Sequence, residues 1–298
     1  MNLTEAVKQL ALDQQVDFVR IAPVERFSQA PQGHKPTDLL KGAQSVVSIG
    51  MKLLEGVRRA NVLGHEDHDM RHALYSYLWF GYGNINLHFL DRTSHLVARL
   101  LEKEGYVSLP IVASGVDDNM KYMGALSNRH AAVAAGTGQF GWNTLCVTGE
   151  SGPRQRFGSV ITTAPLDPDP MHSGPPLCNL EKCKSLCLEQ YGVAQPICVK
   201  ICPMNALSED KSVNLTIGDQ TYSYARLDKR RCVWAGMGLH KDAGALKHVP
   251  APEVIDSEAL AWGRSQKHPA QNLEMVVIGR SHMCGKCITY CPIGETKK

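Results

Sequence analysis

Two short cysteine runs in the C-terminal half constrain this chain more than any other feature of its sequence. ICVKICPMNAL carries Cys198 and Cys202, and MCGKCITYCPIG carries Cys284, Cys287 and Cys291. Each run ends in C-x3-C-P, a spacing in which the cysteine before the proline ligates the cluster held mainly by the other run. The pair therefore predicts two iron–sulfur clusters that exchange ligands crosswise.

The supply of cysteines matches two 4Fe–4S clusters, which need eight thiolates. Nine of the ten cysteines lie in residues 178–291, and only Cys146 lies outside this stretch. The thiols expected at cluster two are Cys202, Cys232, Cys284 and Cys287. The thiols expected at cluster one are Cys198, Cys291 and two from LCNLEKCKSLC, namely two of Cys178, Cys183 and Cys187. The spacing leaves open which of these three is spare.

Zinc and disulfide bonds are the competing explanations, because C-x2-C also suits a zinc site. Zinc ribbons pair two such units, whereas the prolines after Cys202 and Cys291 have a role in ferredoxin loops and none at a tetrahedral zinc ion. Disulfide scaffolds are small chains without a sufficient core, and 298 residues are enough to bury one. Iron–sulfur chemistry is therefore favoured.

Composition indicates an ordinary globular protein of two domains, with 43% hydrophobic and 20% charged residues. The N-terminal run MNLTEAVKQLALDQQ lacks the apolar core of a signal peptide, and no run approaches the ~20 apolar residues of a membrane span. We therefore expect a cytoplasmic protein without membrane contact. The net charge of +3, with both signs interspersed, gives no footprint for nucleic acid, and the basic run at 229–231 predicts a solvated turn.

Apolar periodicity predicts the first elements: an N-terminal helix, strands at 17–22, 45–53 and 107–113, and helices at 71–80 and 84–104. Gly81 and Gly83 are expected to interrupt the helical stretch, and Gly105 to end it. His65, His68 and His72 have spacings that could bind a metal, but no cysteine or carboxylate pattern converges with them. We expect them on solvated surfaces.

The middle of the chain, SNRHAAVAAG, predicts a short helix with Ser127 as its N-cap and Gly136 at its end. A strand at 144–148 is expected to form a hairpin with RFGSVITTAPL. Gly136, Gly138 and Gly141 spell G-x-G-x-x-G, but they follow a helix and open a strand, which excludes a dinucleotide fingerprint. They are expected either to let the backbone approach a bulky, flat or phosphate-bearing group, or to serve as turn glycines.

A resemblance to a known family becomes apparent at this point. NRHAAVAAGTGQFGWNTLCVTGESGPRQRFGSVITTAPL resembles the E-R-x-x-A-x-x-A-G-L-G-x-x-G-K-N-T segment of epoxyqueuosine reductases. PTDLLKGAQSVVSIG is similar to the P-x-x-L-L-P-G-A-x-S-V-I-S strand of that family, and RLDKRRCVWAG to the site of its isolated cluster cysteine. Reductive dehalogenases share the same plan, and the resemblance extends from about Asp17 to Gly294.

The resemblance implies an α+β chain with a nitroreductase-like, cobalamin-binding domain at 1–170 and a ferredoxin-like domain with two 4Fe–4S clusters at 171–298. Electrons from an external donor, such as a ferredoxin or flavodoxin, would pass singly to the corrinoid cobalt. An electron-transfer protein that binds flavin, or only a partner, is the alternative, because the same fold also hosts flavin. The positions that carry over as corrinoid contacts are Arg129, Gly136, Gly138, Gly141, Asn143, Thr144, Arg156, Phe157, Gly158 and Ser159.

The chain departs from the family pattern at several positions. Trp142 replaces the lysine of G-K-N-T, Asn128 replaces the glutamate before Arg129, and the acidic proton donor of epoxyqueuosine reductases aligns with Tyr122. A phenol is protonated at neutral pH without tuning, so we expect Tyr122 to deliver the proton. The alternatives are that Tyr122 is a packing aromatic and that Asp117 or Asp118 supplies the acid.

The expected substrate is a small molecule. The helical-repeat extension with which epoxyqueuosine reductases hold tRNA is missing from this sequence, which ends six residues after Pro292. The low net charge also argues against a tRNA surface. Reduction of epoxyqueuosine in tRNA is kept as the alternative.

Overall fold

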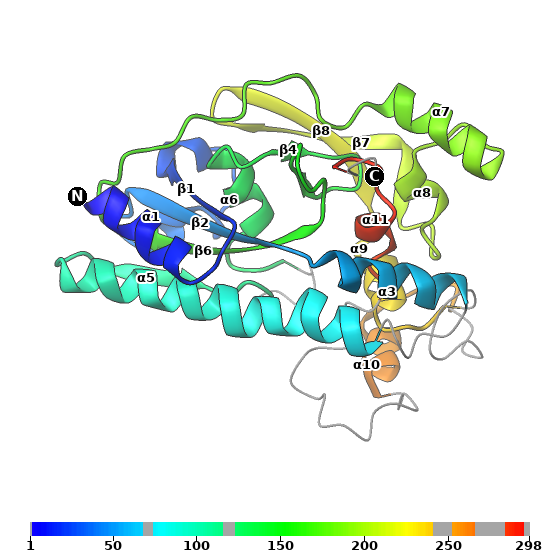
Figure 1. Cartoon of the computed structure of the whole chain (residues 1–298), viewed down its shortest axis with the longest axis horizontal. Helices are drawn as coiled ribbons and strands as arrows, with labels where there is room; N and C mark the ends of the chain where they lie inside the picture. Colours follow the sequence, from blue (N-terminus) through cyan, green and yellow to red (C-terminus); the bar gives the residue numbers. More distant parts are fainter. Residues whose placement is uncertain (1, 68–73, 116–122, 241–251, 266–283, 295–298) are drawn as a thin grey trace.

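The computed structural model describes residues 2–67, 74–115, 123–240, 252–265 and 284–294. Its centre is a four-stranded antiparallel sheet in the order β1-β2-β6-β3 (Figure 1). The strands are β1 (Phe18–Pro23), β2 (Ser45–Lys52), β3 (Ser108–Ile111) and β6 (Gln155–Thr162). β2 and β6 pair along their whole lengths, from Ser45 opposite Thr162 to Lys52 opposite Gln155.

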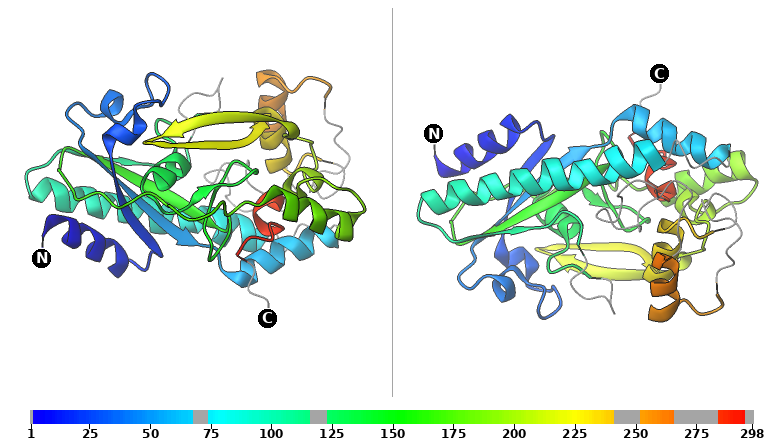
Figure 2. Two further views of the ribbon diagram at one scale, coloured as in Figure 1. Left: turned by 90° about the horizontal axis from the view of Figure 1, so that it is seen from above. Right: turned by 90° about the horizontal axis from the view of Figure 1, so that it is seen from below.

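Helices cover both faces of this sheet (Figures 1 and 2). α1 (Leu3–Asp13) and α5 (Asp91–Lys103) pack on one face around buried Val and Ile side chains of the strands. α6 (Asn128–Ala134) packs on the other face through a run of buried alanines. Small side chains let this helix approach the strands closely, which fixes the position of its flanking residues.

A long hairpin, β7 (Leu207–Ile217) and β8 (Gln220–Leu227), lies between the cysteine runs in sequence but returns to the α6 side of the sheet (Figure 2). Ile217, Tyr222 and Tyr224 join the core around α6. The two-residue turn begins at Gly218, whose φ of 60° is the left-handed conformation that such turns require. This hairpin was not predicted from the sequence.

The nine cysteines of residues 178–291 lie on short helices and their flanking loops. These helices are α7 (Leu180–Tyr191), α8 (Ile197–Lys200), α9 (Lys229–Gly236) and α11 (Lys286–Thr289). α10 (Ser257–Ser265) packs on α9, where Trp262 stacks on Trp234 with ring centroids 6.2 Å apart. The smaller elements are η1 (Val24–Phe27), α2 (Pro36–Leu39), α3 (Glu55–Glu66), β4 (Gln139–Phe140) and β5 (Cys146–Val147).

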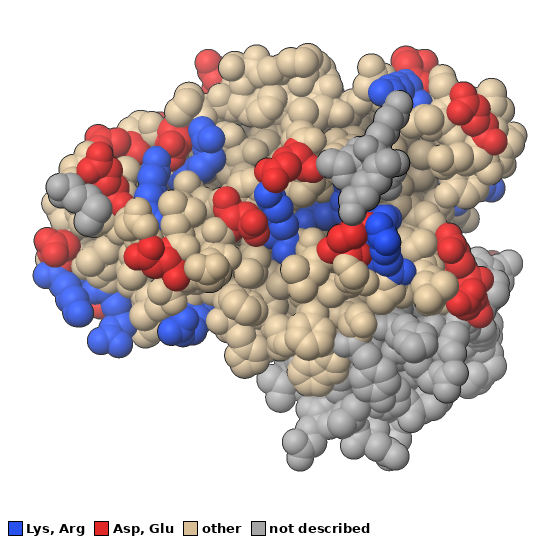
Figure 3. All heavy atoms as spheres, viewed as in Figure 1, with Lys and Arg blue, Asp and Glu red and all other residues tan. Residues whose placement is uncertain are grey.

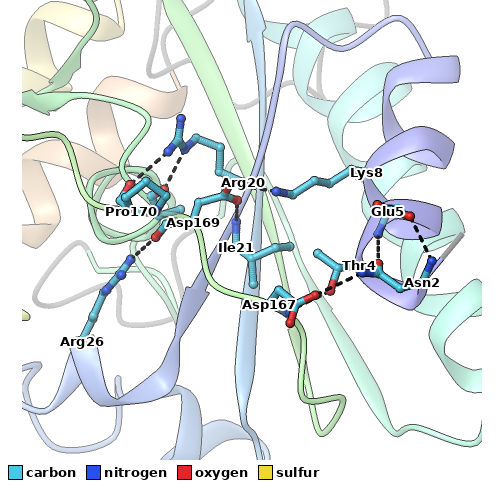
Figure 4. A network of polar contacts seen from close by, with 11 residues as sticks. Asn2, Thr4, Glu5, Lys8, Arg20, Ile21, Arg26, Asp167, Asp169 and Pro170 are labelled. Atoms are coloured by element: carbon cyan, nitrogen blue, oxygen red, sulfur yellow. Dashed lines mark hydrogen bonds and ion pairs between the residues drawn. The ribbon is translucent and has the colours of Figure 1, made fainter.

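A polar network fastens the segment at the predicted domain boundary to the sheet (Figure 4). Asp169 accepts a hydrogen bond from the Ile21 backbone at 2.8 Å and pairs with Lys8 at 2.8 Å. Arg20 donates to the carbonyls of Ala135 and Pro170 at 2.9 and 3.0 Å. These bonds fix the path along which the chain leaves the central sheet and its helices (the N-terminal layer). Arg20 also satisfies the carbonyl of Ala135 at the C-terminal end of α6.

Four expectations about local structure are corrected. β5 pairs with β4, not with β6, because β6 is already paired with the longer strands β2 and β3. Gly81 and Gly83 do not break the helical stretch, which continues with widened turns through η2 (Leu74–Gly83) and η3 (Ile85–Leu90) into α5. The basic run at 229–231 forms the first turn of α9 instead of a solvated turn. His65 is buried, whereas His68 and His72 lie outside the described residues.

The predicted ends of other elements hold. Gly105 follows α5 with a φ of 88°, and Ser127 occupies the N-cap position of α6, although its hydroxyl bonds to His130 at 2.6 Å and not to the helix backbone. Within the described part of the chain, no helix is both long and apolar enough to span a bilayer.

Candidate redox site

The two predicted thiol sets come from elements that are far apart in sequence and meet in space. The cluster-one candidates are Cys178 before α7, Cys183 and Cys187 within it, Cys198 in α8, and Cys291 after α11. The cluster-two candidates are Cys202 after α8, Cys232 in α9, Cys284 before α11, and Cys287 within it. The α8 run provides Cys198 to the first set and Cys202 to the second, and the α11 run provides Cys291 to the first set and Cys284 and Cys287 to the second. Each run thus serves both sets, as the crossed motif requires.

Mutual electrostatics groups the cluster-one thiols. The pKa of Cys198 lies well above its ordinary value, because burial disfavours the thiolate and because the thiolates of Cys178, Cys291 and Cys183 lie nearby. Burial also raises the pKa of Cys291 to about 12, with further contributions from Cys178 and Cys183. The thiols of Cys178, Cys183, Cys198 and Cys291 therefore lie near enough to influence one another's ionisation.

The cluster-two thiols form a second group by the same criterion. Burial of its thiol raises the pKa of Cys232 to about 12, and the nearby Cys284 and Cys202 raise it further. The residue as a whole is exposed. Burial likewise raises the pKa of Cys284 to about 11, and Cys202 contributes. The pKa of Cys287 is raised by burial and then by Cys232 and Cys284. A weaker influence of Cys198 on Cys287 shows that the two groups adjoin.

Backbone amides point at the sulfurs of both groups. The N–H groups of Trp142 and Ile197 donate to the Sγ atoms of Cys178 and Cys183, each at 3.4 Å, and the N–H of Ala206 donates to Sγ of Cys202 at 3.2 Å. Such donors favour the thiolate form that binds metal. Among the described residues, no three His, Cys, Asp or Glu side chains converge closely enough to hold a single metal ion.

Cys187 differs from its neighbours. Its side chain is fully buried in a cluster with Ile197 and Ile201, whereas Cys183 is only partly buried at the same cluster. The Cys187 thiolate raises the pKa of Cys183, one helical turn away. The thiolates that raise the pKa values of Cys198 and Cys291 belong to the other cluster-one candidates. Cys146 is also buried, which raises its pKa, and it lies apart from both groups beside Tyr222.

Helix α3 holds the cluster-two loop, a role that the sequence analysis missed. Arg58 donates to the carbonyl of Thr289 at 3.2 Å, and Asn61 accepts from the Thr289 hydroxyl at 2.8 Å. Nε2 of His65 donates to the carbonyl of Cys284 at 2.6 Å. Positions 58, 61 and 65 share one helix face by their spacing, so the signal was present, but their partner lies more than 200 residues away.

The segment before β6 holds the last cluster-one loop. Arg154 donates to the carbonyls of Cys291 and Ile293 at 2.7 and 2.6 Å. A side chain at Gly152 would overlap the Ile293 carbonyl, so glycine is required for this close approach. The N-terminal layer therefore binds the backbone of both C-terminal cysteine loops directly.

The three glycines of the G-x-G-x-x-G letters lie in the order predicted, after α6 and around β4. Gly136 has a φ of 79°, and a Cβ there would overlap the carbonyl oxygen of Pro170. A Cβ at Gly138 would overlap the carbonyl of Val147, and one at Gly141 would lie 2.7 Å from Oδ1 of Asn143. The chain itself therefore fills the open faces of these glycines.

Arg129 and the residues of the turn at 141–144 form one structural unit. Nη1 of Arg129 donates to the carbonyl and hydroxyl of Thr144 at 3.0 and 2.8 Å, and burial lowers the pKa of this guanidinium. Thr144 has a φ of 69°, which is strained for a β-branched residue. Asn143 is buried and donates to the carbonyl of Cys287 at 3.0 Å.

Arg156 at the start of β6 is committed to η2. It donates to the Gly81 carbonyl at 3.0 Å and to the Tyr77 hydroxyl at 2.9 Å, and it lies over the Tyr82 ring at 5.1 Å. Burial raises the pKa of Tyr77 to about 12.

The next three residues of β6 are in the core. Phe157 is buried, and a Cβ at Gly158 would lie 3.0 Å from the Ser94 hydroxyl. Ser159 is fully buried, and its hydroxyl has no hydrogen-bond partner within the described part of the chain. The predicted acids Tyr122, Asp117 and Asp118 lie outside the described residues.

Comparison of whole folds places this arrangement among known proteins. An epoxyqueuosine reductase structure aligns with 100% of this chain and 68% of its own, with a TM-score of 0.50 and 15% identity. The catabolic reductive dehalogenase NpRdhA aligns with 94% of this chain, with a TM-score of 0.51 and 16% identity. The fold is that of epoxyqueuosine reductases and reductive dehalogenases.

The α+β class and the family resemblance expected from the sequence are thus confirmed at the level of fold. A further reductive dehalogenase structure, described in terms of B12-dependent dehalogenation, aligns with a TM-score of 0.51 and 15% identity. The chain spans about two thirds of the epoxyqueuosine reductase but only 35% of either dehalogenase chain. No family model and no curated protein sequence matches the chain.

Proposed function

We propose that the protein is a cobalamin-dependent iron–sulfur reductase in which two 4Fe–4S clusters supply electrons singly to a corrinoid cobalt. The observation that carries this proposal is the sorting of eight thiols into two adjoining groups, with Cys202 and Cys291 each crossing to the group of the other run. Crossed ligation of this kind is the ferredoxin pattern.

The donor chemistry of the two groups fits iron–sulfur clusters. Each offers four thiols, and N–H groups are directed at sulfurs in both. We assign Cys187 as the spare cysteine because its surroundings are apolar. Bound clusters would store and release electrons one at a time, while α3, Asn143 and Arg154 hold the backbone of the ligand loops in place.

Ser159 and Asn128 support the fit to cobalamin, whereas Gly136 and Gly138 do not. Buried hydroxyl and amide oxygens of Ser159 and Asn128 have hydrogen-bonding capacity unused by the described chain. The backbone around Gly136 and Gly138 is covered by the protein itself, so we assign these glycines to folding and not to corrinoid contact. Bound cobalamin would supply the reduction at its cobalt, and the N-terminal domain, proposed at 1–170, would orient the substrate.

Metal analysis of anaerobically purified protein tests the clusters. We expect about eight iron and eight sulfide per chain for two 4Fe–4S clusters. A value of about four iron, or zinc in place of iron, would remove the two-cluster proposal.

Reconstitution with cobalamin, followed by optical spectroscopy, tests the corrinoid. Binding at micromolar cobalamin is expected, with FMN as the parallel ligand. Binding of FMN alone would move the protein to the flavin-type electron-transfer class.

A small molecule is the proposed substrate, and an external ferredoxin or flavodoxin the proposed electron donor. On the face shown in Figure 3, lysine and arginine side chains alternate with aspartate and glutamate, which gives no continuous path for phosphates. A mobility-shift assay with tRNA at two salt concentrations tests this choice. Tight binding that weakens steeply with salt would favour epoxyqueuosine reduction in tRNA.

Tyr122 is the proposed proton donor, by position relative to Arg129. Tyr122→Phe keeps the ring and removes only the hydroxyl, so we expect turnover of an identified substrate to fall while cluster and cobalamin content stay unchanged. Turnover at the parent rate would move the acid to Asp117 or Asp118.

A further inference from the structure

The tip of the turn at 141–144 touches both thiol groups. Its two tip residues are Trp142 and Asn143, and the turn is closed by bonds from the N–H of Gly141 to the carbonyl of Leu145 and from the N–H of Thr144 to the carbonyl of Gly141, both at 2.9 Å. The backbone N–H of Trp142 donates to Cys178 of cluster one. The side chain of Asn143 donates to the carbonyl of Cys287 of cluster two.

The Trp142 side chain extends this double contact. Its ring packs in an apolar cluster that contains Cys198 from cluster one and Cys287 from cluster two. The other members are Leu207, Ala225 and Leu227 of the β7–β8 hairpin and Val199 of α8. The ring therefore occupies space that adjoins both thiol groups and contributes no charge to it.

The orientation of the ring is fixed from the hairpin side. The indole N–H donates to the carbonyl of Ser208 at 3.1 Å, and the N–H of Ala225 donates to the Trp142 carbonyl at 3.1 Å. These bonds hold the backbone and the ring of Trp142 together against β7 and β8. Both the backbone and the indole ring of Trp142 are therefore held in place.

We infer that Trp142 is a positioning residue that excludes water from the space between the two thiol groups and thereby keeps the cluster potentials low. This inference rests on the proposed function, since it requires the clusters. Reduction adds negative charge to a cluster, so a dry, uncharged neighbour disfavours the reduced state, while water or a cation stabilises it. The lysine of the family motif would place a cation at this position, and the tryptophan removes it.

Redox titration of purified, cluster-loaded variants tests the inference. Trp142→Leu removes the ring and leaves room for water, Trp142→Lys adds a cation, and Trp142→Phe retains most of the apolar ring. Trp262→Phe is the matched control, because Trp262 lies half-exposed on α10. The readouts are iron content and the potentials of the clusters followed by electron paramagnetic resonance.

We expect Trp142→Leu and Trp142→Lys to raise at least one cluster potential, so that the ratio of reduced to oxidised cluster at a fixed potential rises about tenfold, or about 59 mV for one electron. Trp142→Phe should shift less, and Trp262→Phe not at all. Full iron content with unchanged potentials in both Trp142→Leu and Trp142→Lys would overturn the inference. If Trp142→Lys loses iron, the cluster potentials of Trp142→Leu alone decide the test. If both variants lose iron while the parent protein keeps it, Trp142 is a packing residue and the inference fails. Parent protein without iron would instead overturn the proposed function.

Discussion

Replacement of Cys187 distinguishes the spare cysteine from the ligands beside it. Cys187→Ala removes one sulfur from a fully buried apolar site next to Ile197 and Ile201. The lost burial of a methyl-sized group, with the small cavity left behind, costs about 1–2 kcal/mol of folding free energy. Cys187→Ser should cost a similar or larger amount, about 1–3 kcal/mol, because it buries a hydroxyl without a partner. Neither change should alter the iron content.

Cys183→Ala is the matched comparison, since Cys183 lies on the same helix and has a backbone N–H directed at its sulfur. Loss of one cluster-one ligand should reduce iron from about eight to about four per chain. Iron and sulfide analysis of anaerobically purified variants, with urea unfolding for the stability term, measures both effects. The assignment is refuted if Cys187→Ala halves the iron while Cys183→Ala retains it.

Three further predictions concern the scaffold around this site. Gly136→Ala should lower the free energy of unfolding by at least about 3 kcal/mol, because the added Cβ meets a backbone oxygen. Gly33 also has a left-handed φ but faces open space, so Gly33→Ala should cost only about 1–2 kcal/mol. Urea unfolding measures both values. Arg129→Met should cost about 3 kcal/mol, since it leaves the strained Thr144 carbonyl without its donor, and an unchanged unfolding midpoint would contradict this reading. Burial lowers the pKa of His130 to about 3, so the unfolded chain takes up a proton at this histidine before the folded chain does as pH falls. The stability that this histidine contributes is therefore fully present above pH 6.5 and is lost toward pH 3. His130→Phe should flatten the fall in unfolding midpoint between about pH 7.5 and 5.5.

The cysteine motifs were informative because short spacings fix local loops. C-x2-C and C-x3-C-P beside a short helix place their sulfurs by backbone geometry, so the proposed membership of Cys202, Cys284 and Cys287 in cluster two could be predicted from the sequence. Which of Cys178, Cys183 and Cys187 is spare did not follow from spacing, because ten residues separate Cys187 from the next cysteine, Cys198. The proposed assignment of Cys187 uses its packing with Ile197 and Ile201, which the sequence does not show.

Non-local contacts explain the error at β5 and the open question at the glycines, but not the missed hairpin of β7 and β8. The expected hairpin of β5 with β6 fails because β2, more than 100 residues earlier, offers β6 an eight-residue partner, while β5 has only two residues to pair. The hairpin of β7 and β8 was missed although its signal, alternating apolar residues around Gly218, was local. Whether the glycines at 136 and 138 face a cofactor or serve as turn glycines was left open, because the sequence does not show that Pro170 and Val147 lie against them.

The turn at 141–144 connects these observations. The family resemblance assigned it to the corrinoid, and the structure places its tip residues, Trp142 and Asn143, against both thiol groups. Thr144 adopts a strained conformation, and Arg129 holds it there with two hydrogen bonds from a buried guanidinium. Strain is retained where the surroundings over-determine a conformation, and here those surroundings fix the spacing between α6 and the cysteine loops. Electron transfer between redox groups depends on that spacing being constant, so the strained turn, more than the glycines around it, is the feature through which the N-terminal layer would control the clusters.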